Sequence, residues 1–173
     1  MDLQLVEREN VLLGQDFLTW LWYKTESENA LFEIKDKRTF SVNMEQRVSV
    51  QGGDGEGVET ATVSSPRGEL TEAKTGLKTG KKVNKAQLRF AMDQDEWLMQ
   101  VKADDFGLSG FKTPKINTKD DDGDDPDSKF LEKLFLLERG LEMLDAVFTR
   151  FLVLRLSREW TEESAAVKLW ING

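Results

Sequence analysis

A run of apolar residues near the carboxyl end constrains the fold of this chain more than any other feature. Its members recur at strict four- and three-residue intervals, the spacing of one helix face: Phe130, Leu134, Leu137, Leu141, Leu144, Phe148 and Phe151. The stripe is widened by Leu131, Leu136, Met143, Val147 and Leu154. Ser128 is placed to cap this helix. About 30 residues at 1.5 Å per residue would span roughly 45 Å. We therefore expect the helix to pack along a whole sheet, or partly against a second chain.

Residues 30–63 change to a period of two, which is typical of strands. Phe32 and Ile34 share one side of a first strand, and after the polar "DKR" turn the alternation continues through Phe40 and Val42. The pattern resumes after a shift at Val48, which indicates either a bulge or a separate strand. The glycine-rich residues 51–57 are typical of a loop, and residues 60–64 are typical of a third strand.

A second hairpin is predicted from the alternation between residues 82 and 102. Its apolar face carries Ala86, Leu88, Phe90 and Met92, and after "DQDE" it returns through Trp97, Met99 and Val101. Before it, residues 66–68 predict a turn and residues 69–82 a short helix closed by Gly80. The fold class is therefore α+β, an antiparallel sheet of hairpins packed with a short N-terminal helix and a long C-terminal helix.

Three regions follow from this pattern. Residues 1–117 form the mixed region, residues 118–127 an acidic linker, and residues 128–173 the long helix and a tail that packs on the same core. The tail after residue 158 predicts either a short helix or a last strand.

The N-terminal helix is expected over residues 15–26, following Gly14. Phe17, Leu18, Leu21 and Trp22 share one face and predict its buried side. Trp20 lies well round from that face, so Trp20 and Tyr23 could edge a binding surface.

Composition excludes several function classes. At 173 residues, 39% of them hydrophobic, the chain suits one packed domain. It has no cysteine and no histidine, which removes disulfides, thiolate nucleophiles, imidazole bases and the usual zinc ligands. No signal peptide is evident at the start, and no apolar run approaches the roughly 20 residues that span a bilayer. We expect a cytoplasmic protein with no membrane partner, no cofactor and no enzymatic activity.

Two apparent motifs fail on spacing. "GLKTGKK" at residues 76–82 has one residue too few between its glycines for a phosphate loop, and Lys82 stands where a metal-binding hydroxyl belongs. The run "DDDGDDPD" at residues 120–127 lacks both end ligands of a calcium loop. Hairpin-end carboxylates, among them Asp104 and Asp105, could hold Mg²⁺ for nuclease chemistry, but turns collect aspartate for conformational reasons.

Basic residues concentrate between positions 67 and 89, a segment that contains seven basic and only two acidic residues. The whole chain, in contrast, has a formal charge of −8. Helical spacing followed by strand alternation makes a continuous basic surface geometrically plausible. Such surfaces bind phosphate backbones without reading base sequence. The candidate DNA-binding residues are Lys74, Lys78, Lys81, Lys82, Lys85 and Arg89. The alternative interpretation is an ordinary solvated face.

Three blocks carry a resemblance: "LGQDFLTWLWYKTE", "LTEAKTGLKTGKKVNKAQLRFAMDQDEWLMQVKADDF" and "FLEKLFLLERGLEMLDAVFTRFLVLRLSREW". In that order they resemble the C-terminal part of the bacterial recombination-associated RdgC family. The resemblance implies a nucleoid-associated protein that binds double-stranded DNA with little sequence preference, forms a ring-like dimer and restrains a RecA-type recombinase by occupying its DNA. Family members carry a preceding N-terminal half, so a complete ring is not expected of these 173 residues.

Two rival hypotheses belong to other classes. In the first, the chain is an acidic protein-interaction or oligomerisation module without DNA binding, and the broad apolar stripe of the long helix assembles with a partner or with a second copy in a homodimer. In the second, the chain is a Mg²⁺-dependent nuclease that uses Asp104 or Asp105. The nuclease hypothesis fails if purified protein with Mg²⁺ leaves DNA intact.

Overall fold

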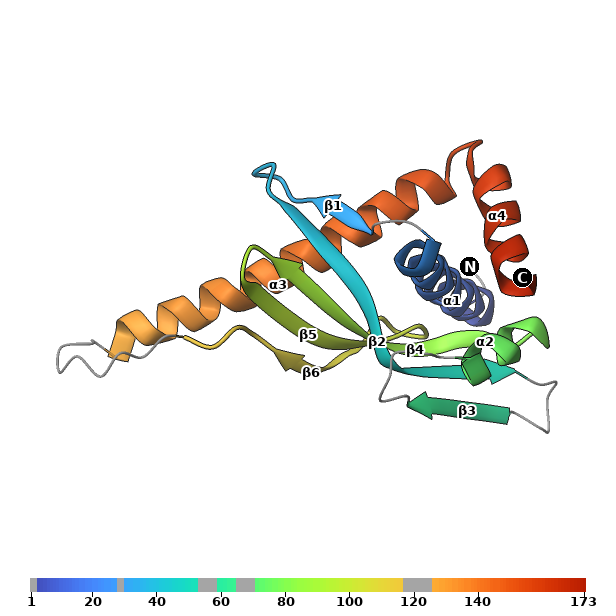
Figure 1. Cartoon of the computed structure of the whole chain (residues 1–173), viewed down its shortest axis with the longest axis horizontal. Coiled ribbons are helices and arrows are strands. Elements are labelled where there is room, and N and C mark those ends of the chain that lie inside the picture. The colour runs from blue at the N-terminus through green and yellow to red at the C-terminus, as the bar shows by residue number, and fades with distance from the viewer. Residues whose placement is uncertain (1–2, 28–29, 53–58, 65–70, 117–125) are drawn as a thin grey trace.

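The computed structural model describes residues 3–27, 30–52, 59–64, 71–116 and 126–173 (Figure 1). It confirms the α+β class, with an antiparallel sheet, an N-terminal helix and a long C-terminal helix. The helices are α1 (Leu3–Ser27), α2 (Thr71–Lys78), α3 (Pro126–Arg155) and α4 (Trp160–Asn172). The strands are β1 (Leu31–Glu33), β2 (Thr39–Gly52), β3 (Glu59–Ser64), β4 (Lys82–Met92), β5 (Asp95–Lys102) and β6 (Leu108–Lys112).

The sheet runs β1-β2-β4-β5-β6, and β3 pairs with the second half of β2 on the edge whose first half pairs with β1. Both predicted hairpins are confirmed. The shift expected near Val48 is a bulge within one strand, because β2 continues through it while its register against β4 changes between Met44 and Val48. Strand β6 was not predicted, since its five residues include a glycine and follow another.

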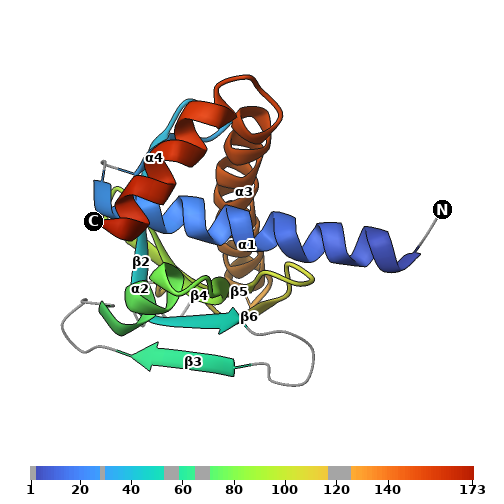
Figure 2. The same ribbon diagram turned by 90° about the vertical axis from the view of Figure 1, so that its right-hand side faces the viewer.

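The two faces of the sheet differ. On β4 the side chains of Ala86, Leu88 and Phe90 are fully buried, while Lys85, Gln87 and Arg89 between them are partly exposed. The helices approach the buried face: Gly76 of α2 lies against Val50, and α3 accepts a hydrogen bond from Trp97 at its Leu136 carbonyl. Figure 2 shows α1, α2 and α4 together on one side of β2 and β3. One face therefore holds the core, and the other carries polar side chains.

Helix α1 begins well before the predicted position and runs through Gly14. A Cβ at Gly14 would lie only 1.8 Å from the backbone oxygen of Ala103, so the glycine marks a close crossing inside the helix, not its start. The predicted buried face, which includes Phe17 and Leu21, is confirmed. The interpretation of Trp20 as turned away from the core is wrong, because α3 and α4 cover the side of α1 that the sheet does not; Trp20 is 2% exposed.

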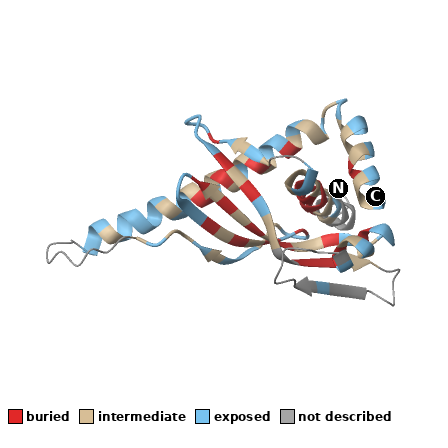
Figure 3. Ribbon diagram, in the orientation of Figure 1, coloured by how far each residue is buried: buried red, intermediate tan, exposed pale blue. Residues whose placement is uncertain are grey.

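Helix α3 begins at Pro126, two residues before the predicted cap, so Ser128 lies inside the helix. Proline suits the first helical position because its φ is already fixed near the helical value. The buried residues of α3 are Gly140, Met143, Val147 and Phe151. Met143, Val147 and Phe151 belong to the predicted stripe, whereas the first members of that stripe are exposed where the helix extends past the sheet, as Figure 3 shows.

The remaining elements complete the same core. Helix α2 ends at Lys78 and is closed, as predicted, by Gly80, whose φ is +88°. The tail forms α4, which fits the helical alternative, and its Val167 joins the core with Met143 and Val147. Of the other predictions, most of the loop at 51–57, the turn at 66–68 and most of the linker at 118–127 lie outside the described residues.

Candidate nucleic-acid interface

The six basic residues predicted to form one surface are divided between two sides of the sheet. Lys74 belongs to the helix layer, where its Nζ lies 3.1 Å from Glu26 Oε2 of α1 and 4.5 Å from the centre of the Trp170 ring of α4. Lys78 follows one turn later on α2 and is exposed. Lys85 and Arg89 lie on the polar face of β4 instead. The continuous basic surface expected from spacing is therefore not formed, because α2 packs on the opposite face from Lys85 and Arg89.

Arg89 is fully engaged by carboxylates. Its Nε donates to Glu45 Oε1 of β2 at 2.5 Å, and its Nη1 donates to Glu96 Oε2 of β5 at 2.7 Å. The hydrogen bond to Glu45 is the main reason that the pKa of Arg89 is raised further above its usual value. Two carboxylates beside one guanidinium leave no positive charge for a phosphate, so Arg89 is a weak candidate.

Lysines on the polar face of the sheet are better candidates for phosphate contacts than Arg89. Antiparallel pairing sets Lys85 of β4 directly opposite Lys102 of β5, and it sets Lys112 of β6 opposite Leu98. Lys82, at the exposed start of β4, pairs with Gln51 across the bulge. Among the described residues, no ion pair is made by the side chains of these four lysines. Like charges placed directly opposite each other destabilise a sheet unless an anion lies between them.

We call Lys82, Lys85, Lys102 and Lys112 the sheet-face lysines. Polar uncharged side chains lie among them, since Gln87 pairs with Gln100 and Ser109 donates to the Gln100 side chain at 3.1 Å. Lys102 and Lys112 were not among the predicted site residues. Only the strand register brings Lys102 beside Lys85, although the alternation of β5 already placed Lys102 on the polar side.

Lys81 differs from its neighbour Lys82. Its side chain is half-buried and lies over Gly52 and Gly76, so its aliphatic part serves as packing between β2 and α2. The same region settles the apparent phosphate loop: Gly76 lies inside α2 and Gly80 ends it, whereas a phosphate loop leads into the start of a helix.

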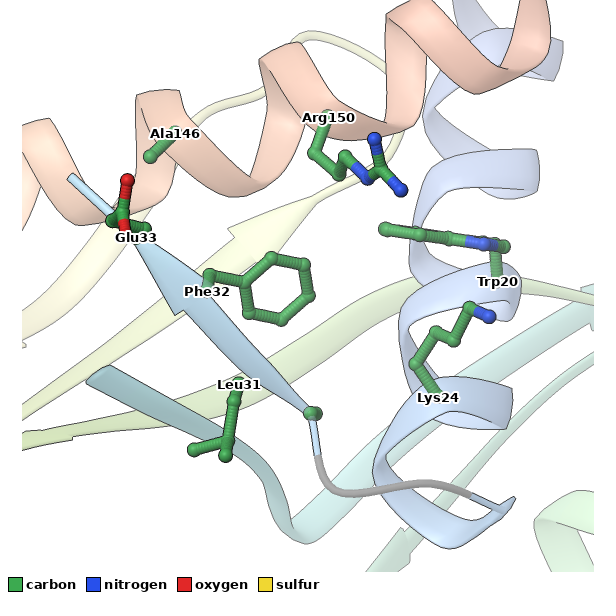
Figure 4. Close-up of a pocket in the computed structure, with 8 residues that line it drawn as sticks. Trp20, Lys24, Leu31, Phe32, Glu33, Ala146 and Arg150 are labelled. Carbon is green, nitrogen blue, oxygen red and sulfur yellow. The ribbon is translucent and has the colours of Figure 1, made fainter. Parts of the chain in front are cut away.

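A separate cavity of about 370 Å³ lies between α1, β1 and α3 (Figure 4). Arg150 reaches from α3 toward Trp20, and Phe32 covers the strand side. Lys24 on its wall is paired with Glu163 at 2.8 Å, and Glu33 stands at the other end. These carboxylates balance the two cations, so the cavity is not suited to a polyanion.

The hairpin-end carboxylates do not converge. Asp105 accepts the backbone N–H of Gly107 at 2.7 Å, and this bond is the main reason that its pKa is lowered. Within the described parts of the chain, no three acidic side chains are grouped as a metal ion would require. The nuclease hypothesis thus gains no geometric support from Asp104 and Asp105.

Comparison with protein-family models, with curated proteins and with solved structures gave no match. Among the described helices, none is both long and apolar enough to cross a membrane.

Proposed function

We propose that this chain is a sequence-independent DNA-binding module whose sheet-face lysines contact the phosphate backbone. The observation that carries the proposal is the directly opposed pair Lys85 and Lys102, neither of which forms an ion pair with a described residue. A phosphate between two strands would remove their repulsion, and lysines bind phosphates without selecting bases.

The polar side chains around the sheet-face lysines favour DNA binding without sequence preference. The side-chain amides of Gln87 and Gln100 can donate hydrogen bonds to phosphate oxygens, while Glu45 and Glu96 are held by Arg89. Occupation of duplex DNA would exclude a RecA-type recombinase from the same stretch, which is the role that the resemblance to the RdgC family implies. Association with the nucleoid would follow from the same contacts.

A salt titration of binding to a fluorescent duplex of random sequence tests the proposal. Four neutralised phosphates predict that log K falls with log salt at a slope of about −3.6, whereas all six originally predicted cations would give about −5. Lys85→Glu/Lys102→Glu should weaken binding at least about tenfold for every duplex sequence. The matched control is Lys168→Glu, because Lys168 is exposed on α4, away from the sheet face. DNA affinity that is unchanged by the double substitution, or a slope of log K against log salt near zero, contradicts the proposal.

A second candidate function is protein interaction through α3, and a different observation favours it. Six large apolar side chains on the first half of α3 are 41% to 64% exposed. Monomeric proteins rarely leave contiguous apolar patches of this kind uncovered. Light scattering on the full chain separates a second copy from a different partner, since only self-association doubles the mass.

A further inference from the structure

The exposed side chains on α3 form a stripe that borders a groove. We define the α3 stripe by the exposed large apolar residues between positions 130 and 141: Phe130, Leu131, Leu134, Phe135, Leu137 and Leu141. Figure 3 shows this half extending past the sheet, with most of its surface exposed. The stripe spans about 11 residues, or roughly 17 Å at 1.5 Å per residue, which matches three turns of a second helix.

The groove has a volume of about 530 Å³ and lies between α3 and the segment that follows β6. Its apolar lining comes from Phe111, Pro114, Ile116 and Leu137. Leu137 belongs to both the groove and the α3 stripe, so the two surfaces are continuous. An apolar side chain that enters this groove can be followed along α3 by others spaced one helical turn apart.

Three lysines line the groove as well: Lys115, Lys129 and Lys133. Lys129 and Lys133 are one helical turn apart, and Leu137 occupies the next turn. Neither Lys115 nor Lys133 forms an ion pair with a described residue. An apolar groove with several ammonium groups at its wall attracts a ligand that is both apolar and negatively charged.

We propose that the groove and the α3 stripe bind an acidic amphipathic helix of another protein. Its apolar side chains, spaced i, i+4 and i+7, would occupy the groove and the stripe, and its carboxylates would pair with Lys115 and Lys133. A second copy of this chain is a poorer occupant, because a twofold interface presents the same lysines from both sides. The inference rests on the interaction function of α3 and is independent of DNA binding.

The test uses the full chain and a fluorescein-labelled helical peptide of about 16 residues, built from glutamate and alanine with leucines at i, i+4 and i+7. Fluorescence anisotropy should give a saturable isotherm in the micromolar range. Two control peptides should bind at least about tenfold more weakly: one with lysine in place of glutamate and one with serine in place of leucine.

Two double variants test the two halves of the surface. Lys115→Glu/Lys133→Glu removes the charge complementarity, and Leu134→Ser/Leu137→Ser removes apolar contacts at side chains that are each 41% exposed, so that folding is preserved. Each should weaken binding of the acidic peptide at least about tenfold. Lys168→Glu and Lys85→Glu/Lys102→Glu should leave it unchanged, which separates this surface from the sheet-face lysines.

Three results would overturn the inference. Equal binding of the lysine peptide would show that charge plays no part. A doubled mass in light scattering that returns to the single-chain value in Leu134→Ser/Leu137→Ser would identify a second copy as the occupant. Displacement of the peptide by random duplex, together with loss of DNA binding in Lys115→Glu/Lys133→Glu, would make the groove a general polyanion site.

Discussion

The two halves of α3 are similar in sequence and opposite in environment. In the second half, Met143, Val147 and Phe151 are completely buried in the core, while in the first half Phe130 and Leu131 are more than 60% exposed. The apolar side chains of α3 are therefore enclosed along its second half and mostly exposed along its first. One apolar stripe on a long helix can therefore supply core residues along part of its length and an exposed apolar surface along the rest. Periodicity alone does not show where the buried part ends and the exposed part begins.

The largest expected effect on stability comes from replacing phenylalanine by alanine, and it should differ between the two halves of α3. Phe151→Ala should lower the free energy of unfolding by about 3–5 kcal/mol, because its ring packs 5.4 Å from both Phe17 and Trp20 and leaves a cavity when removed. The matched change Phe130→Ala should stay within about 0.5 kcal/mol, since that ring is 64% exposed. Urea unfolding of both variants checks this. Equal losses would show that the first half is covered within the single chain.

Gly140 lies where the two halves meet, and its replacement should have the next largest effect. A Cβ there would stand 2.6 Å from Phe111 Cζ and 2.9 Å from Trp97 Cδ1, so both rings would have to shift. We expect Gly140→Ala to destabilise the fold by about 1 kcal/mol, after the gain in helix propensity is subtracted from the steric cost. Thermal unfolding measures it. A stabilised variant would mean that α3 is not seated closely at this position.

A smaller effect is expected at Arg139, whose guanidinium ties the first half of α3 to the β1–β2 turn. Its Nη1 lies 3.1 Å from Asp36 and 3.0 Å from Glu142, and its side chain is only 12% exposed. Arg139→Met keeps the aliphatic packing and removes the charge, and it should cost about 1 kcal/mol in urea unfolding. Arg150→Met is the control, since Arg150 is exposed. Equal stability of Arg139→Met and the parent chain would show that packing alone holds this turn.

The smallest effect concerns pH at the same turn. The hydrogen bond from the Arg38 side chain is the main cause that lowers the pKa of Asp36 below its usual 3.8. A carboxyl with a lowered folded pKa contributes stability above its unfolded pKa, and that stability is lost as pH falls through the folded pKa. On going from pH 7 to pH 3, the Tm of Asp36→Asn should therefore fall slightly less than the Tm of the parent chain. A larger loss in the variant would contradict the sign.

Local alternation was enough to predict both hairpins and the fold class. The register of β4 with β5 follows from a short turn, and each buried position from Ala86 to Met92 was expected from period two. The sequence could not predict contacts between residues that are far apart in the chain. Glu45 and Glu96 reach Arg89 from other strands, and Lys102 joins Lys85 only through pairing. A stripe of similar residues also does not say which side of a helix its own sheet will cover.

Two of the missed features did leave a signal. A glycine among leucines at Gly140 marks the closest approach of α3 to the sheet, because no side chain fits there. Gly14 is its counterpart in α1, where it was taken for a helix start. In α3 the glycine indicated the packed side better than the exposed large residues did, whereas in α1 the glycine and the large residues indicated the same side.

The contacts of α4 with α1 have a consequence for how the chain is made. Trp20 Nε1 donates to Glu163 at 2.8 Å, and Trp170 Nε1 donates to Glu26 at 3.1 Å, so each bond joins positions more than 140 residues apart. During synthesis from the amino end, the first helix leaves the ribosome long before the segment that encloses it. Trp20 therefore cannot be fully enclosed until Phe151 and Glu163 have been made, so its burial depends on segments synthesised long after it.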